Sequence, residues 1–210
     1  MVERHETVNT KKPLVVVDLD GTLVKGNTFR IFIHCGLKHL ASEHKYIKLL
    51  TVLSMLGLRK LGLISHRYLK FKALPIIGEN DELKESFTGA ILPLLNEDVT
   101  RVLDSYKADG YDILLATAAA DTYVPWIYNG DYQATRIKHN QDHAENRGEL
   151  KLQHVLEYAE ARNLELKVVL TDHYDDCPLL EYGAYNILVC PSHNTLNRLR
   201  AKNVRIDRII

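Results

Sequence analysis

The stretch LVVVDLDGTL, residues 14–23, joins four apolar residues to two aspartates that are separated by one leucine. A short, continuous apolar run that contains three valines predicts a buried β-strand. Side chains alternate between the two faces of a strand, so Asp18 and Asp20 are expected to point the same way, with Leu19 toward the packing. Gly21 permits a tight turn off the strand. The stretch therefore predicts a buried strand that presents two carboxylates at its end.

Two carboxylates held this close need a partner. At a separation of about 4 Å they repel by roughly 4 kcal/mol at an effective dielectric constant near 20, so a cation or a proton between them is expected. A calcium-binding EF-hand loop does not fit, because its glycine stands at position six after a helix, whereas Gly21 would stand at position four after a strand. Two solvated aspartates are an alternative that this stretch alone leaves open.

The rest of the chain predicts alternating strands and helices. Four later stretches resemble buried strands: residues 111–117, 132–137, 166–172 and 186–190. Between them, residues 97–108 and 149–163 carry apolar side chains at helical spacing. This alternation is typical of βαβ units, and it predicts an α/β fold with a doubly wound parallel sheet.

Residues 28–92 interrupt that alternation directly after the first strand. Their pattern is helical, and we expect an inserted helical segment over 28–92, with residues 1–27 and 93–210 forming the core domain. The apolar stretch at 49–64 is interrupted by Arg59 and Lys60 and is shorter than the roughly 20 residues that a membrane span needs. It is open whether this stretch forms the core of the insertion, a dimer surface or a site for a lipophilic substrate.

Further polar side chains are expected at the same edge of the sheet. Thr117 and Asp172 end two of the later strands, and Asp176 follows four residues after Asp172. The carboxyl ends of parallel strands meet at one edge, where ligands bind in such sheets. Lys151 opens the helix before one of these strands and could reach that edge. Several carboxylates with a hydroxyl are the hard oxygen ligands that Mg²⁺ prefers, with room for a substrate phosphate.

Composition places the chain among ordinary globular proteins. It has 210 residues, 46% of them hydrophobic, and 27 basic residues balance 27 acidic ones. This balance indicates neither a nucleic-acid surface nor a polybasic membrane anchor. Three widely spaced cysteines predict neither a disulfide framework nor a zinc site, and residues 1–12 lack the apolar core of a signal peptide. We therefore expect a cytoplasmic protein without a membrane span, and its oligomeric state stays open.

Four motifs together resemble the haloacid dehalogenase-like hydrolases, in the phosphoserine-phosphatase-like branch (subfamily IB). DLDGTL resembles the first signature in its phosphatase form, LLATAA the second, GELK the third and TDHYDDCPLLE the fourth. They occur in order, and the helical segment after the first motif is similar to the cap of that branch. The resemblance implies a Rossmannoid core with a C1-type helical cap. The chain departs from the branch at Thr171, His173 and Ala119, where relatives carry other residues.

The resemblance also implies roles for the residues in the motifs. Asp18 would be the nucleophile that forms an aspartyl-phosphate, and Asp20 would be the general acid and base. Thr117 and Lys151 would bind the phosphoryl oxygens. Mg²⁺ would be held by Asp18, Asp172 and the backbone carbonyl of Asp20, supported by Asp176. The second aspartate of the first motif argues against dehalogenation.

The substrate is expected to be a small phosphorylated molecule. Ala118 and His173 flank the motif residues and are candidates to contact it, as is Arg67 from a basic cluster in the insertion. Asn27 stands where phosphoserine phosphatases carry an acidic residue, so a substrate other than phosphoserine is expected. A phosphotransferase that uses the same intermediate, or a phosphate-binding module without catalysis, are the rival interpretations.

Overall fold

The computed structural model describes residues 11–138 and 140–210, so the polar stretch at residues 1–10 lies outside the described part. Within these ranges one six-stranded sheet has the order β3-β2-β1-β4-β5-β6, with parallel neighbours throughout. The strands are β1 (Lys12–Val17), β2 (Asp112–Ala120), β3 (Asp131–Thr135), β4 (Leu164–Thr171), β5 (Tyr185–Leu188) and β6 (Arg208–Ile209). The predicted α/β class with a parallel sheet is confirmed; β6 is a short edge strand that the sequence patterns did not indicate.

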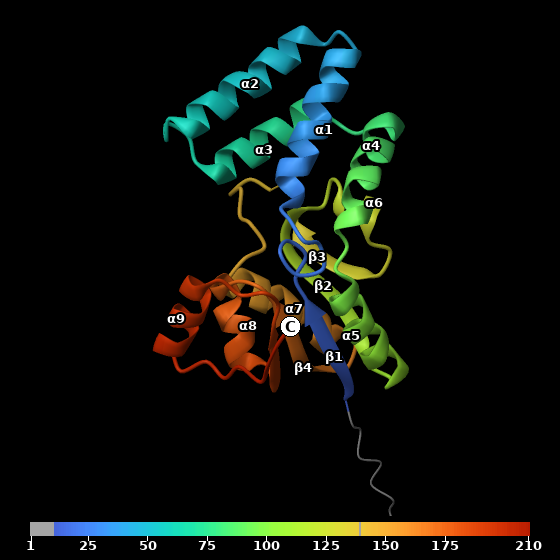
Figure 1. The fold of residues 1–210 in the computed structure, drawn as a ribbon, viewed down its shortest axis with the longest axis vertical. Coiled ribbons are helices and arrows are strands. Elements are labelled where there is room, and N and C mark those ends of the chain that lie inside the picture. Colours follow the sequence, from blue (N-terminus) through green and yellow to red (C-terminus); the bar gives the residue numbers. More distant parts are fainter. Residues whose placement is uncertain (1–10, 139) are drawn as a thin grey trace, which may run out of the picture.

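Helices follow the strands in the order that parallel crossovers require (Figure 1). They are α1 (Thr28–Ser42), α2 (Tyr46–Lys60), α3 (His66–Ile77), α4 (Asp81–Ile91), α5 (Glu97–Ala108), α6 (Val124–Ile127), α7 (Glu149–Ala161), α8 (Cys177–Tyr182) and α9 (His193–Ala201), with 3₁₀ turns η1 (Leu92–Leu94) and η2 (Tyr174–Asp176). None of the described helices has the length and apolar content that crossing a membrane needs.

The first strand lies at the centre of the sheet, between β2 and β4. Its side chains alternate between two cores: Val15 and Val17 pack on the face covered by α5, and Leu14 and Val16 on the face covered by α7, α8 and α9. All four are almost completely buried. Strand β1 is flanked by connections that run in opposite directions, and such a reversal of strand order creates a ligand-binding crevice at the carboxyl edge.

Four helices, α1 to α4, come between β1 and α5 and are called here the four-helix segment (residues 28–91). They stand beyond the carboxyl end of β1, at the opposite end of the molecule from the start of that strand (Figure 1). Asparagine or serine side chains cap three of them: Asn27 on α1, Ser65 on α3 and Asn80 on α4. These caps fix where each helix begins, so the segment enters and leaves the edge of the sheet at defined points.

Candidate active site

The end of β1 brings Asp18 and Asp20 into one cavity of about 270 Å³. The backbone N–H of Asp18 still bonds to the carbonyl of Leu170 on β4 at 2.9 Å, so the sheet holds this residue in place. Asp172, which follows β4, lines the same cavity. The structure therefore brings together three of the carboxylates that the sequence assigned to one edge of the sheet.

Gly21 makes the close approach of Asp172 feasible. Its backbone has φ of +80°, and a Cβ atom there would lie 2.2 Å from Oδ2 of Asp172. No side chain fits at that distance, and the left-handed backbone disfavours one as well. The glycine in the first motif is thus needed for two reasons, the turn and the room for a carboxylate.

Asp20 is held by the start of α1. Its Oδ1 accepts a hydrogen bond from the backbone N–H of Thr28 at 2.7 Å, in the first turn of the helix, where free N–H groups and the helix dipole favour negative charge. Burial raises the pKa of Asp20, and the hydrogen bond from Thr28 opposes that shift. The Asp20 side chain is therefore held in place by Thr28, and its raised pKa favours the protonated form.

Lys151, in the first turn of α7, joins two carboxylates. Its Nζ lies 2.8 Å from Oδ1 of Asp18 and 2.8 Å from each carboxylate oxygen of Asp176. The Lys151 side chain is 3% exposed. Burial by itself would lower its pKa, but the charges of Asp176 and Asp18 outweigh burial and raise it. Lys151 is consequently a fixed cation beside the Asp18 carboxylate.

Negative charge is nevertheless in excess in the cavity. Burial raises the pKa of Asp18 to about 7, with Asp176 and Asp20 adding to the shift and Lys151 opposing it. Burial likewise raises the pKa of Asp172 to about 6, although His173 opposes the rise. Burial is the main cause of both shifts and the neighbouring aspartates add to them, so a bound cation would stabilise the ionised carboxylates.

The donor set suits a hard divalent cation. Asp18 and Asp172 offer carboxylate oxygens, and the backbone carbonyl of Asp20 is a third oxygen of the type that Mg²⁺ binds. Both Asp176 oxygens are engaged by Lys151, and Oδ2 also accepts from the hydroxyl of Thr171 at 2.7 Å. Asp176 therefore acts on this site through Lys151, and we assign it a supporting place.

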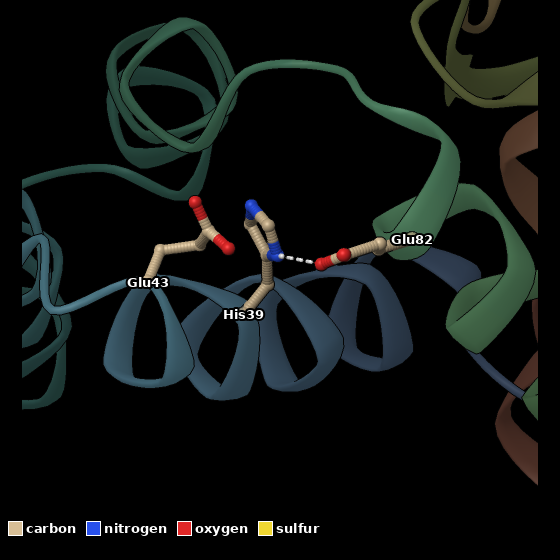
Figure 2. A group of neighbouring side chains, drawn as sticks. All are labelled: His39, Glu43 and Glu82. Atoms are coloured by element: carbon tan, nitrogen blue, oxygen red, sulfur yellow. Dashed lines mark ion pairs between the residues drawn. The ribbon is translucent and has the colours of Figure 1, made fainter.

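A different group of possible metal ligands lies in the four-helix segment. Figure 2 shows His39 and Glu43 on α1 and Glu82 on α4, whose ligand atoms lie within 4.8 Å of one another, a closeness that no other such trio among the described residues shares. The amide N–H of Asn80 faces Nε2 of His39 at 2.6 Å, while its Oδ1 caps α4 by accepting from Leu83. Nδ1 of the same ring lies 3.8 Å from a carboxylate oxygen of Glu82, so both ring nitrogens already face protein partners.

The other predicted site residues fall into two groups. Asn27, Ala118 and His173 line the cavity. Thr117 is 1% exposed and is not among the residues found to line it, and its hydroxyl accepts from the N–H of Ala119 at 3.0 Å. Arg67 is exposed and also lies outside the lining of the cavity.

On α3 it is His66 and Lys70, not Arg67, that reach the cavity. They are four residues apart and share one helix face, whereas Arg67 is rotated about 100° from His66. Lys70 is 4% exposed, donates to the carbonyl of Ala118 at 3.1 Å and pairs with Glu145. Lys70 was not predicted as a site residue. It stands three, four and seven residues before the buried Ala73, Leu74 and Ile77, and this spacing could have indicated that it shares the inward face of α3.

Loop residues before α7 complete the cavity. Glu145 and Arg147 line it, and Arg147 pairs with Asp175, which also lies 2.9 Å from Nδ1 of His173. Neither Glu145 nor Arg147 has a periodic pattern or a motif that sequence reasoning could use. They are functional candidates that only the folded chain shows.

Comparison with protein families assigns the chain that carries this site to a known family. A family model described as haloacid dehalogenase-like hydrolase matches residues 15–181, which include Asp18, Asp20, Lys151 and Asp172. The chain belongs to the haloacid dehalogenase-like hydrolases. It is therefore an enzyme of a hydrolase family, and the predicted family membership is confirmed. Phosphatases of this family generally use a divalent metal.

Solved structures with the same fold are distant in sequence. A protein of unknown function from Bordetella pertussis Tohama I is 17% identical, with a TM-score of 0.73 over 96% of this chain and 99% of that one. A phosphoserine phosphohydrolase-like protein from Francisella tularensis subsp. tularensis SCHU S4 is 18% identical, with a TM-score of 0.55 over 94% of each chain. A phosphoserine phosphatase described as a phospho-aspartyl intermediate analogue is 16% identical, with a TM-score of 0.57 over 95% and 93%. No curated protein matches this hydrolase.

Proposed function

We propose that this hydrolase is a Mg²⁺-dependent phosphomonoesterase that acts through an aspartyl-phosphate on Asp18. The observation that carries the proposal is the pairing of the largely buried Asp18 carboxylate with Lys151 at 2.8 Å, in a cavity that Asp20 and Asp172 also line. A nucleophile, a proton carrier and a fixed cation are then within one small space, which is what splitting phosphate hydrolysis into two displacements requires.

In the first displacement an oxygen of Asp18 attacks phosphorus, and the bond from phosphorus to the ester oxygen breaks. Asp20 gives its proton to the departing alkoxide, which leaves as an alcohol. In the second displacement the Asp20 carboxylate takes a proton from water as that water attacks phosphorus. The bond between Asp18 and phosphorus then breaks, releasing phosphate and restoring both carboxyl groups.

The geometry around Asp20 suits this double duty. Its raised pKa favours a proton before the first displacement, and its bond to the N–H of Thr28 stabilises the carboxylate left afterwards. Lys151 holds Asp18 and balances charge on the phosphoryl group. Thr117 is kept as a proposed phosphoryl-binding group because of its place in the second motif; its hydroxyl accepts from Ala119, and its side chain lies outside the lining of the cavity.

Mg²⁺ would be held by Asp18, Asp172 and the carbonyl of Asp20, and when bound it would neutralise charge on the phosphoryl oxygens. Asp176 would keep Lys151 in place. We propose that residues 28–92 act as a cap over residues 1–27 and 93–210, limiting access of water to the cavity. The buried Lys70–Glu145 pair, which links α3 to the loop before α7, supports this division.

The substrate we propose is a small phosphomonoester other than phosphoserine. The amide oxygen of Asn27 accepts from the N–H of Arg30 at 2.9 Å as the cap of α1, which uses one of its two lone pairs. As a neutral group it also lacks the charge that would strengthen a bond to an ammonium group. Glu79 pairs with Lys138 and Glu82 lies beside His39, so neither supplies the missing charge. Of the predicted substrate contacts, His173 is favoured by its place in the lining of the cavity, whereas Arg67 is exposed and lies outside it.

A phosphate-release screen over amino acid, sugar, glycerol and nucleotide phosphomonoesters tests the proposal. Turnover is expected with Mg²⁺, should stop with EDTA and should return when Mg²⁺ is restored. Full turnover in verified metal-free protein, or release from none of the panel, would overturn it, and phosphoserine ranking first would overturn the substrate assignment. Added alcohols with product analysis distinguish a phosphotransferase.

We place the enzyme in the cytoplasm. Cys35, Cys177 and Cys190 are free thiols in the described structure, which is consistent with a reducing compartment.

A further inference from the structure

The outward face of α2 is apolar, the reverse of an ordinary surface helix. Of its fifteen residues, all of them described, Val52 alone is buried. Ile47 is 85% exposed, Leu50 64% and, just after the helix, Leu61 74%. These side chains lie on the side of the helix opposite Val52, at spacings of three, eleven and fourteen residues. In Figure 1, α2 is the outermost helix of the four-helix segment, far from the sheet.

The whole outward stripe is uncharged. It comprises Tyr46, Ile47, Leu50, Leu53, Ser54, Gly57, Leu58 and Leu61, and the turn into α3 adds Leu63, which is 68% exposed. A surface helix normally turns its charged residues to water and its apolar ones to the core. Val52 is buried, and Leu49, Met55, Leu56 and Ile64 pack against the core, so one face of the 49–64 stretch does contribute to the core of the four-helix segment. The other face is left to solvent.

Basic residues predominate in the sequence around this stripe, and the acidic residue that precedes it, Glu43, pairs with Lys45. Residues 44–78 contain seven lysines and arginines and neither aspartate nor glutamate, in a chain whose total charge is balanced. Lys48, Arg59, Lys60, Arg67 and Lys72 are exposed, and none of them makes an ion pair within the described chain. The neutral whole-chain charge conceals a local surface that is strongly positive.

We propose that α2 and the α2–α3 turn form a docking surface for an anionic lipid bilayer, with α2 lying in the plane of the interface. An interfacial helix of this kind places its apolar face among the acyl chains and its basic residues near the headgroup phosphates. Lys60 lies beside the stripe, whereas Lys48 and Arg59, four residues before and seven after Val52, are on the same side of the helix as Val52. Their long, exposed side chains extend from there toward the headgroups. At fifteen residues α2 lies on the membrane and does not span it.

The charge pattern selects the bilayer over a second copy of the chain. A two-fold symmetric contact centred on α2 would bring together two segments that carry net positive charge. Since residues 44–78 offer no carboxylate to answer it, such a contact would be repulsive. An anionic surface supplies the missing negative charge along the full length of the helix.

Docking through α2 is compatible with an open active site. The residues of the four-helix segment and of the loop before it that line the cavity lie outside α2. Asn27 precedes α1, Phe29 is on α1, and His66 and Lys70 are on α3. No residue of α2 lines this described cavity. The surface can therefore be occupied without covering Asp18, and the inference stands apart from the proposed phosphatase activity.

Vesicle co-sedimentation tests the proposal with the full chain. The probes are vesicles of phosphatidylcholine alone and of phosphatidylcholine with phosphatidylglycerol, at low and high salt. We expect binding to the anionic vesicles that weakens with salt, because exposed charge interactions are screened. Two variants should each weaken partitioning by at least about tenfold: Ile47→Ser/Leu50→Ser/Leu61→Ser removes apolar contacts, and Lys48→Glu/Arg59→Glu reverses charge.

Matched controls carry the same kinds of change away from α2. Tyr182→Ser/Ile209→Ser alters exposed apolar side chains, and Arg101→Glu/Lys107→Glu alters exposed basic ones on α5; both should bind like the parent. Circular dichroism confirms folding of each variant. Parent protein that stays in the supernatant with anionic vesicles, or α2 variants that bind unchanged, would overturn the proposal. So would light scattering that shows a dimer dissociated by the α2 variants without vesicle binding by the parent.

Discussion

The ammonium of Lys151 lies 2.8 Å from a carboxylate oxygen of Asp18, although 133 positions separate the two residues in the sequence. Lys151 is also the partner of Asp176, so a single buried cation serves two buried carboxylates. A buried charge without a partner is costly, and this triad therefore links the position of the reactive carboxylate to the stability of the core.

Replacing Lys151 should destabilise the fold as well as stop catalysis. Lys151→Met leaves Asp18 and Asp176 buried without their cation, and we expect a loss of about 3 kcal/mol in the free energy of unfolding at pH 8. Urea denaturation measures the loss. Lys167→Met, which removes an exposed lysine paired with Glu165, is the control and should change stability by less than about 0.5 kcal/mol. Equal effects in the two variants would contradict the buried-triad interpretation.

Metal-free protein should lose stability as pH rises. The pKa values of Asp18 and Asp172 are raised from 3.8 to about 7 and about 6. A raised pKa in the folded state contributes stability that is complete below pH of about 4 and is lost as pH rises through the folded pKa. From pH 5 to 8 in EDTA, we expect the free energy of unfolding to fall by roughly 1–3 kcal/mol.

Added Mg²⁺ should reverse this trend, because protons compete with the metal for the same carboxylates. The Mg²⁺-induced rise in Tm is thus expected to be larger at pH 8 than at pH 5. Asp18→Asn/Asp172→Asn should flatten both dependences. An unchanged slope in that variant would assign the pH dependence to other groups.

Substitution of Gly21 has two expected effects that can be measured separately: contact of the new Cβ with Asp172, and strain of the backbone at positive φ. Gly21→Ala and Gly110→Ala both place an alanine at positive φ, of +80° and +83°, but only at Gly21 does a Cβ meet another described atom within 4 Å. Both variants should lose about 1 kcal/mol through strain. Gly21→Ala should also displace Asp172 and weaken Mg²⁺ affinity by roughly tenfold or more. Calorimetric titration with Mg²⁺ checks this, and equal Mg²⁺ affinities would refute it.

Two basic residues of α3 provide a matched test of the cavity. Lys70→Met leaves Glu145 unpaired in a buried position and removes the bond to the carbonyl of Ala118, so kcat/KM should fall by about 10–100-fold. Arg67→Met changes an exposed side chain outside the cavity and should leave kcat/KM within about twofold of the parent. Steady-state kinetics on the best substrate of the screen decides. A larger loss in Arg67→Met would restore Arg67 as the substrate contact.

Substitutions of the two aspartates of the first motif should have different effects on catalysis. Asp18→Asn removes the nucleophile, so no acid-stable phosphoenzyme should be trapped and turnover should vanish. Asp20→Asn keeps the nucleophile but loses proton transfer, which contributes roughly 10²–10⁴-fold, so slow turnover should persist. Mass spectrometry after rapid acid quenching detects the adduct. Wild-type turnover in Asp18→Asn would show that the assignment is wrong.

Much of the fold follows from local pattern. The apolar run at 14–17 is buried in β1, the helix expected at 97–108 is α5, and the other predicted strands pair in one parallel sheet. Local pattern suffices here because periodicity directly records which side of an element meets the core. The same reasoning brought Asp18, Asp20 and Asp172 to one edge, since parallel strands share the edge at which they end.

Tertiary structure decided which face of each helix turns toward the cavity and which loops lie beside it. The basic cluster at 65–72 did not reveal that Lys70, and not Arg67, turns into the cavity, because the orientation of α3 is set by its packing on α1 and α2. The loop residues Glu145 and Arg147 have no local signal at all.

The apolar stretch of α2 shows the limit most clearly. Its sequence is equally compatible with a buried core and with an exposed interface, since hydrophobic periodicity gives the apolar face of a helix but not what covers it. In the folded chain one face of this stretch packs on the core through Val52, and the opposite face is left to solvent. The sequence by itself determined the sheet and the carboxylates at its edge, and only packing decided which side chains complete the cavity and which surface stays uncovered.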